Sequence, residues 1–146
     1  MVTFQEESLI DVLPELQEVL KDHWKEFHNI EPNFNWELYK TYANAGILCL
    51  VTVRDKTKLV GYHLSFIFPY IHQQDELSAF MDIFFLYPEY RNKHIGKQMF
   101  IHAEKIYKEK GVKRIRAGYR LSKPLSNMYS SLGYKEIEIT TEKVLP

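Results

Sequence analysis

Apolar residues recur at steps of three and four positions in three stretches of the chain, which is the spacing of one face of an α-helix. These stretches are Leu9–Phe27, Trp36–Ala43 and Ile95–Lys110, and a glycine closely follows the second and third. A fourth, shorter helix is predicted to begin at Ser122–Leu125 and to end at Gly133. The pattern therefore predicts four helices distributed along the whole chain.

Runs rich in β-branched and aromatic residues predict the strands. A polar turn joins two of these runs into an antiparallel hairpin, and a polar loop, Gln73–Ser78, leads to the next strand. Residues Ile83–Pro88 carry no charge, which suits a strand covered on both faces. A strand, a helix and a strand in succession predict a parallel pair with a right-handed crossover. The expected strands are Val2–Phe4, Ile47–Val53, Leu59–Phe68, Met81–Tyr87, Val112–Tyr119 and one bent or two separate closing strands within Tyr134–Leu145.

The composition fits one domain that spans residues 1–146, since 45% of the residues are hydrophobic and 14% are aromatic. No apolar run approaches the roughly 20 residues that cross a bilayer. The first residues lack the charged and apolar regions of a signal peptide. We therefore expect a soluble, cytoplasmic protein without membrane contact. Cys49 is the single cysteine, so there is no internal disulfide framework, and we expect a buried strand residue there.

The net charge is zero, but the two parts of the chain differ in sign. Residues 1–90 hold 6 Lys/Arg and 14 Asp/Glu, whereas residues 91–146 hold 13 and 5. A basic second part suits an anionic cofactor and an acidic first part suits a cationic amine, although solvated helix faces give the same totals. Nucleic acid is not an expected partner, because the lysines and arginines from 105 to 116 have no interleaved aromatic platform apart from Tyr107. No metal site is expected, because His23 and His28 do not share a helix face.

One stretch, Met81–Lys97, combines a strand, a basic turn and the start of a helix. Pro88 ends the strand because it has no N–H to donate. Arg91 and Lys93 then lie in the turn, where the free N–H groups of the following helix are expected to point. Phosphate or pyrophosphate is the natural ligand of such a turn. An ordinary strand-to-helix turn with a solvated basic face remains the alternative.

Two motifs resemble those of the GNAT acyltransferases. Arg91–Gly96 is similar to the family pattern Arg/Gln-x-x-Gly-x-Gly/Ala, with His94 in place of the first glycine. Leu125–Tyr134 is similar to Ala-x-x-Phe-Tyr-x-x-Leu-Gly-Phe. The succession of Pro69–His72, Asp82 and Tyr87–Arg91 is, in addition, similar to phage-encoded members of the family.

The resemblance implies an α/β fold with a mixed, mostly antiparallel sheet that splays after the fourth strand, flanked by about four helices. It also implies acetyl-CoA as the acyl donor and no metal. The pantetheine arm would add alongside the central strand as another strand does, helped by a bulge near Pro88. The residues predicted to bind the cofactor are Phe84, Phe85, Leu86, Arg91, Asn92, Lys93, His94, Ile95, Gly96, Lys97 and Ser122.

Three side chains are candidates for catalysis. By the resemblance, Tyr129 is the general acid that protonates the departing CoA thiolate, and a core-facing tyrosine is the alternative. Asp82, at the start of the central strand, is a candidate base, because a partly desolvated carboxylate has a raised pKa; a strand-end aspartate facing water is the alternative. His72 is a second candidate base, or a loop histidine without a role.

The predicted function is therefore the direct transfer of acetyl from acetyl-CoA to a primary amine in a ternary complex, because no nucleophilic cysteine or serine arrangement suggests a covalent intermediate. The acceptor is left open between a small polyamine or aminoglycoside-like amine, a peptide N-terminus and a lysine side chain. By the resemblance, Trp24, Phe27, Trp36 and Tyr39 would line the acceptor site, although core packing is the alternative. A homodimer is left open. The rival hypothesis is a catalytically inactive binding protein on the same fold.

Overall fold

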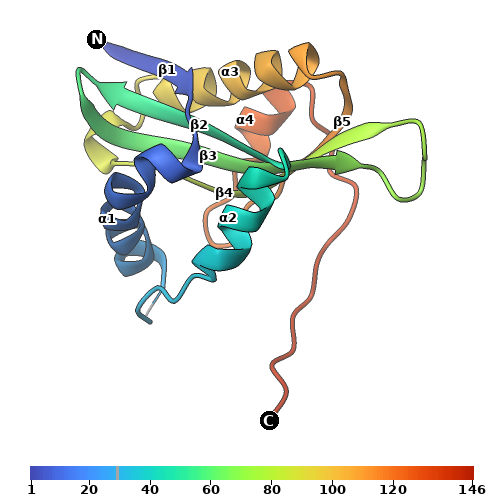
Figure 1. The fold of residues 1–146 in the computed structure, drawn as a ribbon, viewed down its shortest axis with the longest axis horizontal. Helices are drawn as coiled ribbons and strands as arrows, with labels where there is room; N and C mark the ends of the chain where they lie inside the picture. Colours follow the sequence, from blue (N-terminus) through green and yellow to red (C-terminus); the bar gives the residue numbers. More distant parts are fainter. Residues whose placement is uncertain (29) are drawn as a thin grey trace.

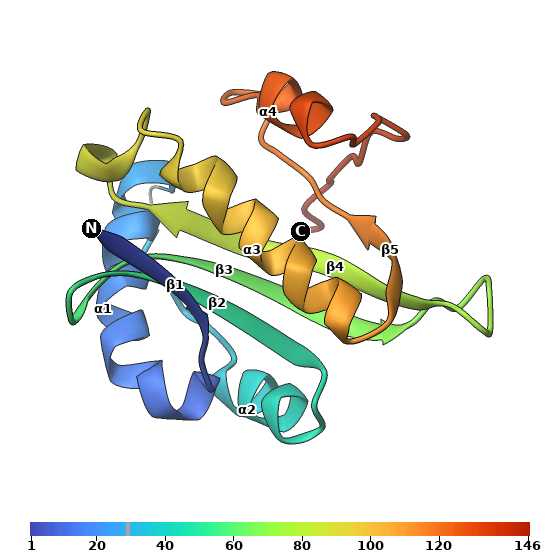
Figure 2. The ribbon, with the colours of Figure 1, turned by 90° about the horizontal axis from the view of Figure 1, so that it is seen from above.

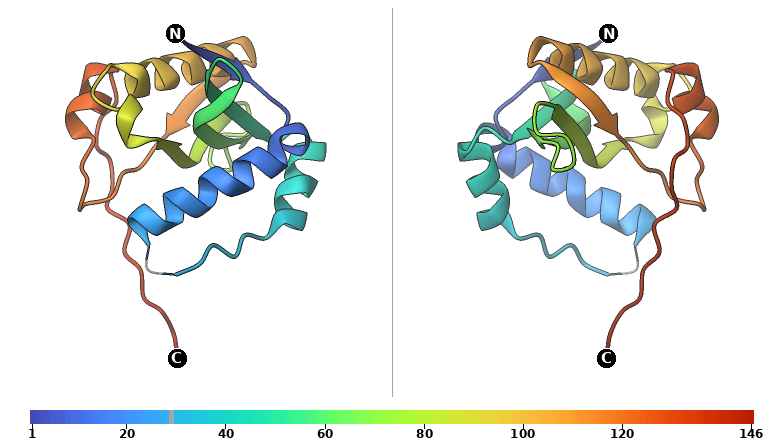
Figure 3. Two further views of the ribbon diagram at one scale, coloured as in Figure 1. Left: turned by 90° about the vertical axis from the view of Figure 1, so that its left-hand side faces the viewer. Right: turned by 90° about the vertical axis from the view of Figure 1, so that its right-hand side faces the viewer.

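The fold is a single sheet with helices on both faces (Figures 1 and 3). The computed structural model describes residues 1–28 and 30–146, and within them it has five strands and four α-helices. Helices α1 and α2 cover one face of the sheet and α3 covers the other, with α4 beside α3. The elements are β1 (Val2–Glu6), α1 (Leu9–Phe27), α2 (Trp36–Asn44), β2 (Leu48–Asp55), β3 (Lys58–Pro69), β4 (Leu77–Leu86), the 3₁₀ turn η1 (Pro88–Tyr90), α3 (Ile95–Glu109), β5 (Val112–Arg116) and α4 (Ser126–Ser131).

The strands lie in the sheet in the order of the chain, β1 to β5. Strands β1 to β4 pair antiparallel, and β5 joins β4 in parallel across α3. The predicted mixed, mostly antiparallel sheet, the hairpin and the parallel pair are confirmed. Cys49 lies buried in β2, as expected, and burial raises the pKa of its thiol to about 12.

The sheet splays after β4. The β4–β5 register ends with Phe80 opposite Arg116, whereas β4 continues to Leu86 along β3. Figure 2 shows β4 running on past the region where β5 lies, with α4 beyond the gap. The β4 edge from Met81 to Leu86 therefore has no strand partner on the β5 side within the described chain. This opening is called the split below, and it is the predicted splay.

A β-bulge lies at Asp82, where the sequence had suggested one near Pro88. Leu64 of β3 pairs with Ile83 and Ser65 pairs with Met81, so Asp82 is the extra residue on β4. A bulge turns successive side chains out of strict alternation. Asp82 and Ile83 consequently both face the α1 and α2 side, where Asp82 meets Tyr39 and Ile83 joins the apolar core.

Four further expectations on element boundaries were wrong. Strand β4 begins at Leu77, so Asp82 lies inside it rather than at its start, and the polar loop ends at Glu76. Strand β5 stops at Arg116 instead of Tyr119, because the chain bends away at the split. Helix α4 begins at Ser126, and the segment from Ser122 precedes it.

The predicted closing strands were also wrong. Residues 135–146 form no strand in the described chain, and they leave the domain on the side of α1 and α2 (Figures 1 and 3). Their apolar side chains are exposed, with Ile137 at 67% and Ile139 at 81%. A local alternation of apolar and polar residues gives strand propensity, but it does not supply a pairing partner.

No helix in the described residues is long and apolar enough to cross a membrane. Within the same residues there is no group of three or more His, Cys, Asp or Glu side chains that would hold a metal ion.

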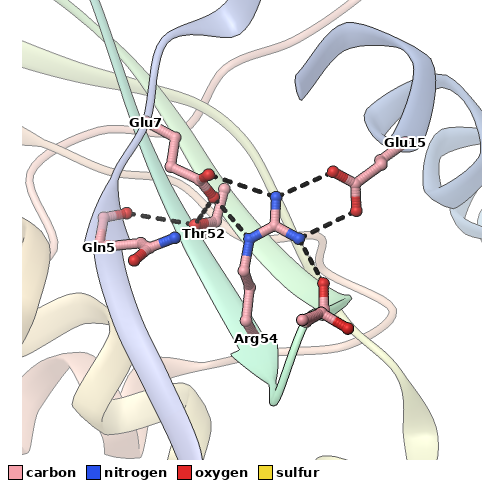
Figure 4. Close-up of polar contacts among 6 residues, drawn as sticks. Gln5, Glu7, Glu15, Thr52 and Arg54 are labelled. Carbon is pink, nitrogen blue, oxygen red and sulfur yellow. Dashed lines mark hydrogen bonds and ion pairs between the residues drawn. The ribbon is translucent and has the colours of Figure 1, made fainter. Parts of the chain in front are cut away.

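Arg54 of β2 links the sheet to the N-terminal half of α1 by hydrogen bonds to Glu15 (Figure 4). Its guanidinium donates to Glu7 at 2.8 and 3.3 Å, to Glu15 at 2.9 and 3.0 Å, and to the Thr57 carbonyl at 2.7 Å. All the N–H donors of an arginine are then used. Burial would raise the pKa of Glu7, but hydrogen bonds from Arg54 and Thr52 outweigh it and hold that pKa below its usual value.

We predict that Arg54→Met lowers the free energy of unfolding by about 3 kcal/mol, because two carboxylates lose their shared cation and the side chain is only 11% exposed. Chemical denaturation measures this. The Arg54 contribution should be fully present above pH 4.5, the usual pKa of a Glu, and should be lost as the pH falls through the lower folded-state pKa of Glu7. Lys40→Met, which breaks an exposed pair with Glu37, is the control and should cost less than about 1 kcal/mol. A loss no larger than that of the control would contradict the prediction.

Candidate active site

Tyr129 lies at the closed end of the split. Its hydroxyl donates to the carbonyl of Gly118 at 2.8 Å and lies 3.7 Å from Sδ of Met81, so it touches both diverging segments. The side chain is 6% exposed and packs against Phe100 and Tyr134. Burial raises the pKa of this phenol well above its usual range, which keeps it protonated at neutral pH. Tyr129 therefore has a proton to donate at the point where the two strands separate.

The N-terminus of α3 follows the opposite end of β4. The first α3 amide with a backbone acceptor is Gln98, which donates to the His94 carbonyl at 2.9 Å. Amides 95–97 have no backbone acceptor in the described chain, as expected for a first helical turn. A Cβ added to Gly96 would meet nothing within 4 Å, so the turn is open. Lys93 is exposed and Lys97 half-buried beside these amides, which suits a phosphate.

His94 has a left-handed backbone, with φ 60° and ψ 2°. Glycine adopts this conformation without the steric cost that a Cβ brings. The glycine of the family pattern is thus a residue that this turn would accept more easily than histidine. The imidazole is exposed and makes no capping hydrogen bond to α3.

Arg91 is directed away from the turn. Its Nε donates to the Leu86 carbonyl at 2.7 Å, and its terminal nitrogens donate to both carboxylate oxygens of Glu26 at 2.6 and 2.7 Å. The guanidinium that sequence reasoning placed on a phosphate is therefore occupied by α1 and by the end of β4. No local pattern in the sequence indicates this pairing, because the partner lies 65 residues away.

Asp82 contacts Tyr39 of α2. The Tyr39 hydroxyl donates to Oδ2 at 2.6 Å, and Oδ1 accepts no hydrogen bond from the described residues. Burial raises the pKa of Asp82 above its usual value, and the bond from Tyr39 offsets part of this rise. Tyr39 itself packs against Phe66 and Trp36. The sequence identified Tyr39 as a candidate for the acceptor wall but not as the partner of this carboxylate.

Of the three β4 residues predicted to pair with the cofactor, Phe84 and Leu86 direct their backbone groups toward the split, whereas the backbone groups of Phe85 face β3. Tyr87 N donates to the Val60 carbonyl, and hydrogen bonds alternate along antiparallel strands, so the amide and carbonyl of Phe84 point toward the split. The Leu86 carbonyl also points there, but it already accepts from Arg91. Phe85 packs its ring into the core beneath α1. Phe84 therefore offers the free groups that an added strand needs.

His72 lies apart from these residues. It is exposed in the connection between β3 and β4, before Leu77, and the paired segment Leu77–Phe80 separates it from the split. Four residues of strand cover about 13 Å. This separation places His72 outside the split. Ser122 is exposed in the connection between β5 and α4, and its predicted cofactor contact stays a prediction.

The aromatic residues expected to line the acceptor site form one cluster. Trp24 packs edge-on against Phe34, which lies 5.2 Å from Trp36, and Trp36 continues the cluster to Tyr39. Phe27 and Trp24 both pack against His23, and the four expected residues are half-buried at the edge of the α1 and α2 core. Core packing therefore accounts for part of each ring, and Tyr39 is the member of the cluster that contacts Asp82.

Solved structures that share this fold include several acetyltransferases. An aminoglycoside acetyltransferase, meta-AAC0020, from an uncultured soil metagenomic sample, in complex with trehalose, is 15% identical over 99% of this chain and 97% of its own, with a TM-score of 0.80. Glucosamine-6-phosphate N-acetyltransferase from Arabidopsis thaliana is 11% identical over 100% and 99%, with a TM-score of 0.77. A predicted acetyltransferase with acetyl-CoA from Clostridium acetobutylicum is 13% identical over 99% and 96%, with a TM-score of 0.73.

The family model described as Acetyltransferase (GNAT) family matches residues 13–134. The chain therefore belongs to the GNAT acetyltransferase family. A comparison with curated protein sequences found no match.

We predict that His94→Gly raises the free energy of unfolding by up to about 1 kcal/mol, because relief of the left-handed backbone exceeds the entropy that glycine adds to the unfolded chain. Thermal or chemical denaturation measures the change. Lys105→Gly, at an exposed position inside α3, is the control and should destabilise by about 1 kcal/mol. Equal losses in both variants would show that His94 is not strained.

We predict that Tyr39→Phe raises the pKa of Asp82, because the carboxylate loses the hydrogen bond that stabilises its charged form. A titration of the Asp82 carboxyl carbon by NMR measures the pKa directly. Tyr42→Phe is the matched control on α2: Tyr42 packs on Phe66, and its hydroxyl makes no hydrogen bond to described residues. An unchanged pKa in Tyr39→Phe would rule out the bond.

Proposed function

We propose that this protein is an N-acetyltransferase that moves the acetyl group of acetyl-CoA directly to a primary amine in a ternary complex. The observation that carries the proposal is the Tyr129 hydroxyl at the split, bonded to Gly118 beside Met81, in a chain that belongs to the GNAT family. The pantetheine arm would pair with the free groups of Phe84, and the pyrophosphate would bind the amides of residues 95–97 with Lys93 and Lys97. The neighbour from Clostridium acetobutylicum was solved with acetyl-CoA, which supports this donor.

In the proposed reaction the amine nitrogen attacks the thioester carbonyl carbon, and the C–S bond breaks as the amide forms. Asp82 accepts the proton that the amine loses, through its free Oδ1 or a water molecule. Tyr129 gives its proton to the departing thiolate, so charge balances without a covalent enzyme intermediate. The two roles fit neighbouring positions of β4, because Met81 contacts Tyr129 while Asp82 faces the α2 side.

The acceptor proposed here is a small cationic amine. Asp82 offers a carboxylate next to the half-buried rings of Trp36 and Tyr39, and such a wall attracts an ammonium group. Similar solved structures include an aminoglycoside acetyltransferase and a glucosamine-6-phosphate N-acetyltransferase, which act on small amines. A peptide N-terminus and a lysine side chain are the other outcomes of an acceptor screen.

We also propose a cytoplasmic location for the protein. Its similarity to phage-encoded members of the family stays a prediction from the motifs.

A second candidate is a binding protein that has lost catalysis. The occupied guanidinium of Arg91 favours it, because the turn before α3 then has one cation fewer for a phosphate. Calorimetric titration with acetyl-CoA separates the candidates. Micromolar binding, roughly −8 kcal/mol, supports the enzyme, whereas no binding at millimolar ligand supports the second candidate.

We predict that Tyr129→Phe lowers kcat by about 100-fold, because the thiolate loses its proton donor, and leaves the Kd of acetyl-CoA unchanged. A thiol-release assay with the best amine of the screen measures kcat, and calorimetry measures the Kd. Tyr107→Phe is the control: this buried phenol of α3 donates to Ser65 and should leave kcat unaltered. A Tyr129→Phe variant as fast as the parent would remove Tyr129 from the mechanism.

A further inference from the structure

Glu26, in the last turn of α1, binds two cations that belong to different sides of the split. Its Oε1 accepts from Arg91 at 2.6 Å and from Lys123 at 3.3 Å, and its Oε2 accepts from Arg91 at 2.7 Å. The hydrogen bond from Arg91 is the main reason that the pKa of Glu26 lies below its usual value. Two-point contacts between a guanidinium and a carboxylate are the strong form of ion pair.

Arg91 connects Glu26 to the β4 side. Besides its bond to the Leu86 carbonyl, its guanidinium lies 5.4 Å from the ring centre of Phe85 and 5.9 Å from that of Phe27. Only 30% of the side chain is exposed. The end of β4 is thus fixed to α1 by a hydrogen bond, a two-point ion pair and two ring contacts.

Lys123 connects Glu26 to the β5 side, because it lies in the chain that leads from β5 to α4. Its ammonium lies 4.3 Å from the ring centre of Phe27. Three residues earlier, Arg120 approaches His28 at 2.8 Å. Arg120 and Lys123 therefore both bring this connection to the C-terminal end of α1. Figure 3 shows the course of the chain there.

These contacts form a closed frame around the split. At the closed end of the split, where the β4–β5 pairing stops, Tyr129 contacts both Met81 of β4 and Gly118, just beyond β5. At the opposite end, where β4 ends, Glu26 binds both Arg91, which follows β4, and Lys123. The β4 edge and the connection to α4 are the two sides. A strand-like ligand placed in the split would therefore lie inside a frame whose width is set before the ligand arrives.

We propose that Glu26 is a positioning residue for acetyl-CoA: it closes the frame by holding Arg91 and Lys123 together and so keeps the split at the width that the pantetheine arm needs. This inference rests on the proposed function and deepens it. In this proposal Arg91, the arginine of the Arg91–Gly96 motif, holds the split in shape and does not bind a phosphate. A frame that is ordered in advance saves the entropy cost of ordering it during binding.

The first test measures the Kd of acetyl-CoA for Glu26→Gln, Lys123→Met and the double variant, well below their unfolding temperatures. Each single change should weaken binding by about tenfold, and the double variant should bind about as weakly as either single one, because both break the same frame. Glu18→Gln and Lys21→Met break another ion pair of α1, at 2.7 Å, and should leave the Kd unchanged. Unchanged binding in both single variants overturns the proposal. Tighter binding in Glu26→Gln also overturns it, since Arg91 would then be a phosphate ligand that Glu26 withholds.

The second test needs no ligand. Spin labels at Glu89→Cys and Leu121→Cys, both exposed, report the distance across the split in a Cys49→Ala background. The distance distribution should be narrow in this parent and clearly broader with Glu26→Gln, but not with Glu18→Gln. Equal widths overturn the proposal. If the protein does not bind acetyl-CoA at all, the proposed function fails, while the distance distributions still decide whether Glu26 closes the frame.

Discussion

The end of hydrogen bonding between β4 and β5 is the constraint on which the rest of the site depends. The two strands pair only as far as Phe80 and Arg116. Beyond that point β4 keeps one edge without a strand partner in the described chain, which is costly in a sheet core unless another group pairs with it. Tyr129 and the turn before α3 lie at the two ends of this unpaired edge, so one backbone feature positions both ends of the proposed donor site.

The difference in charge between the two parts of the chain is in large part an internal feature. Acidic residues of the first 90 positions pair with basic residues of the remainder, as in Glu6 with Lys110, Glu26 with Arg91 and Glu76 with Arg114. The sequence totals suggested an anionic cofactor and a cationic substrate. In the fold these charges join β1 to the end of α3, α1 to the turn before α3, and the start of β4 to β5. The cations that remain exposed at the turn before α3 are Lys93 and, in part, Lys97.

The sequence predicted elements well where a local pattern determines them. Three such features are the α1 periodicity, the hairpin and the glycine after α3. Each depends on residues that lie close together in the sequence. Features that require a distant partner were not predictable in this way. The bulge at Asp82 depends on the register against β3, and the pairing of Arg91 depends on Glu26 in another layer. The alternation of Ile137 and Ile139 predicted a strand, but the described chain pairs no strand with that segment.

The order of the strands in the sheet is the order of the chain, and this has a consequence for assembly. The β2–β3 and β3–β4 pairings close short loops, whereas β5 reaches β4 only after α3 has been traversed. The split needs β4, β5, α4 and the end of α1 together. A chain that holds only its two central hairpins is therefore an ordinary antiparallel sheet with no opening, and the capacity to hold an acyl donor arises at the completion of the fold. Any ligand of the split should therefore stabilise the whole domain rather than one part of it.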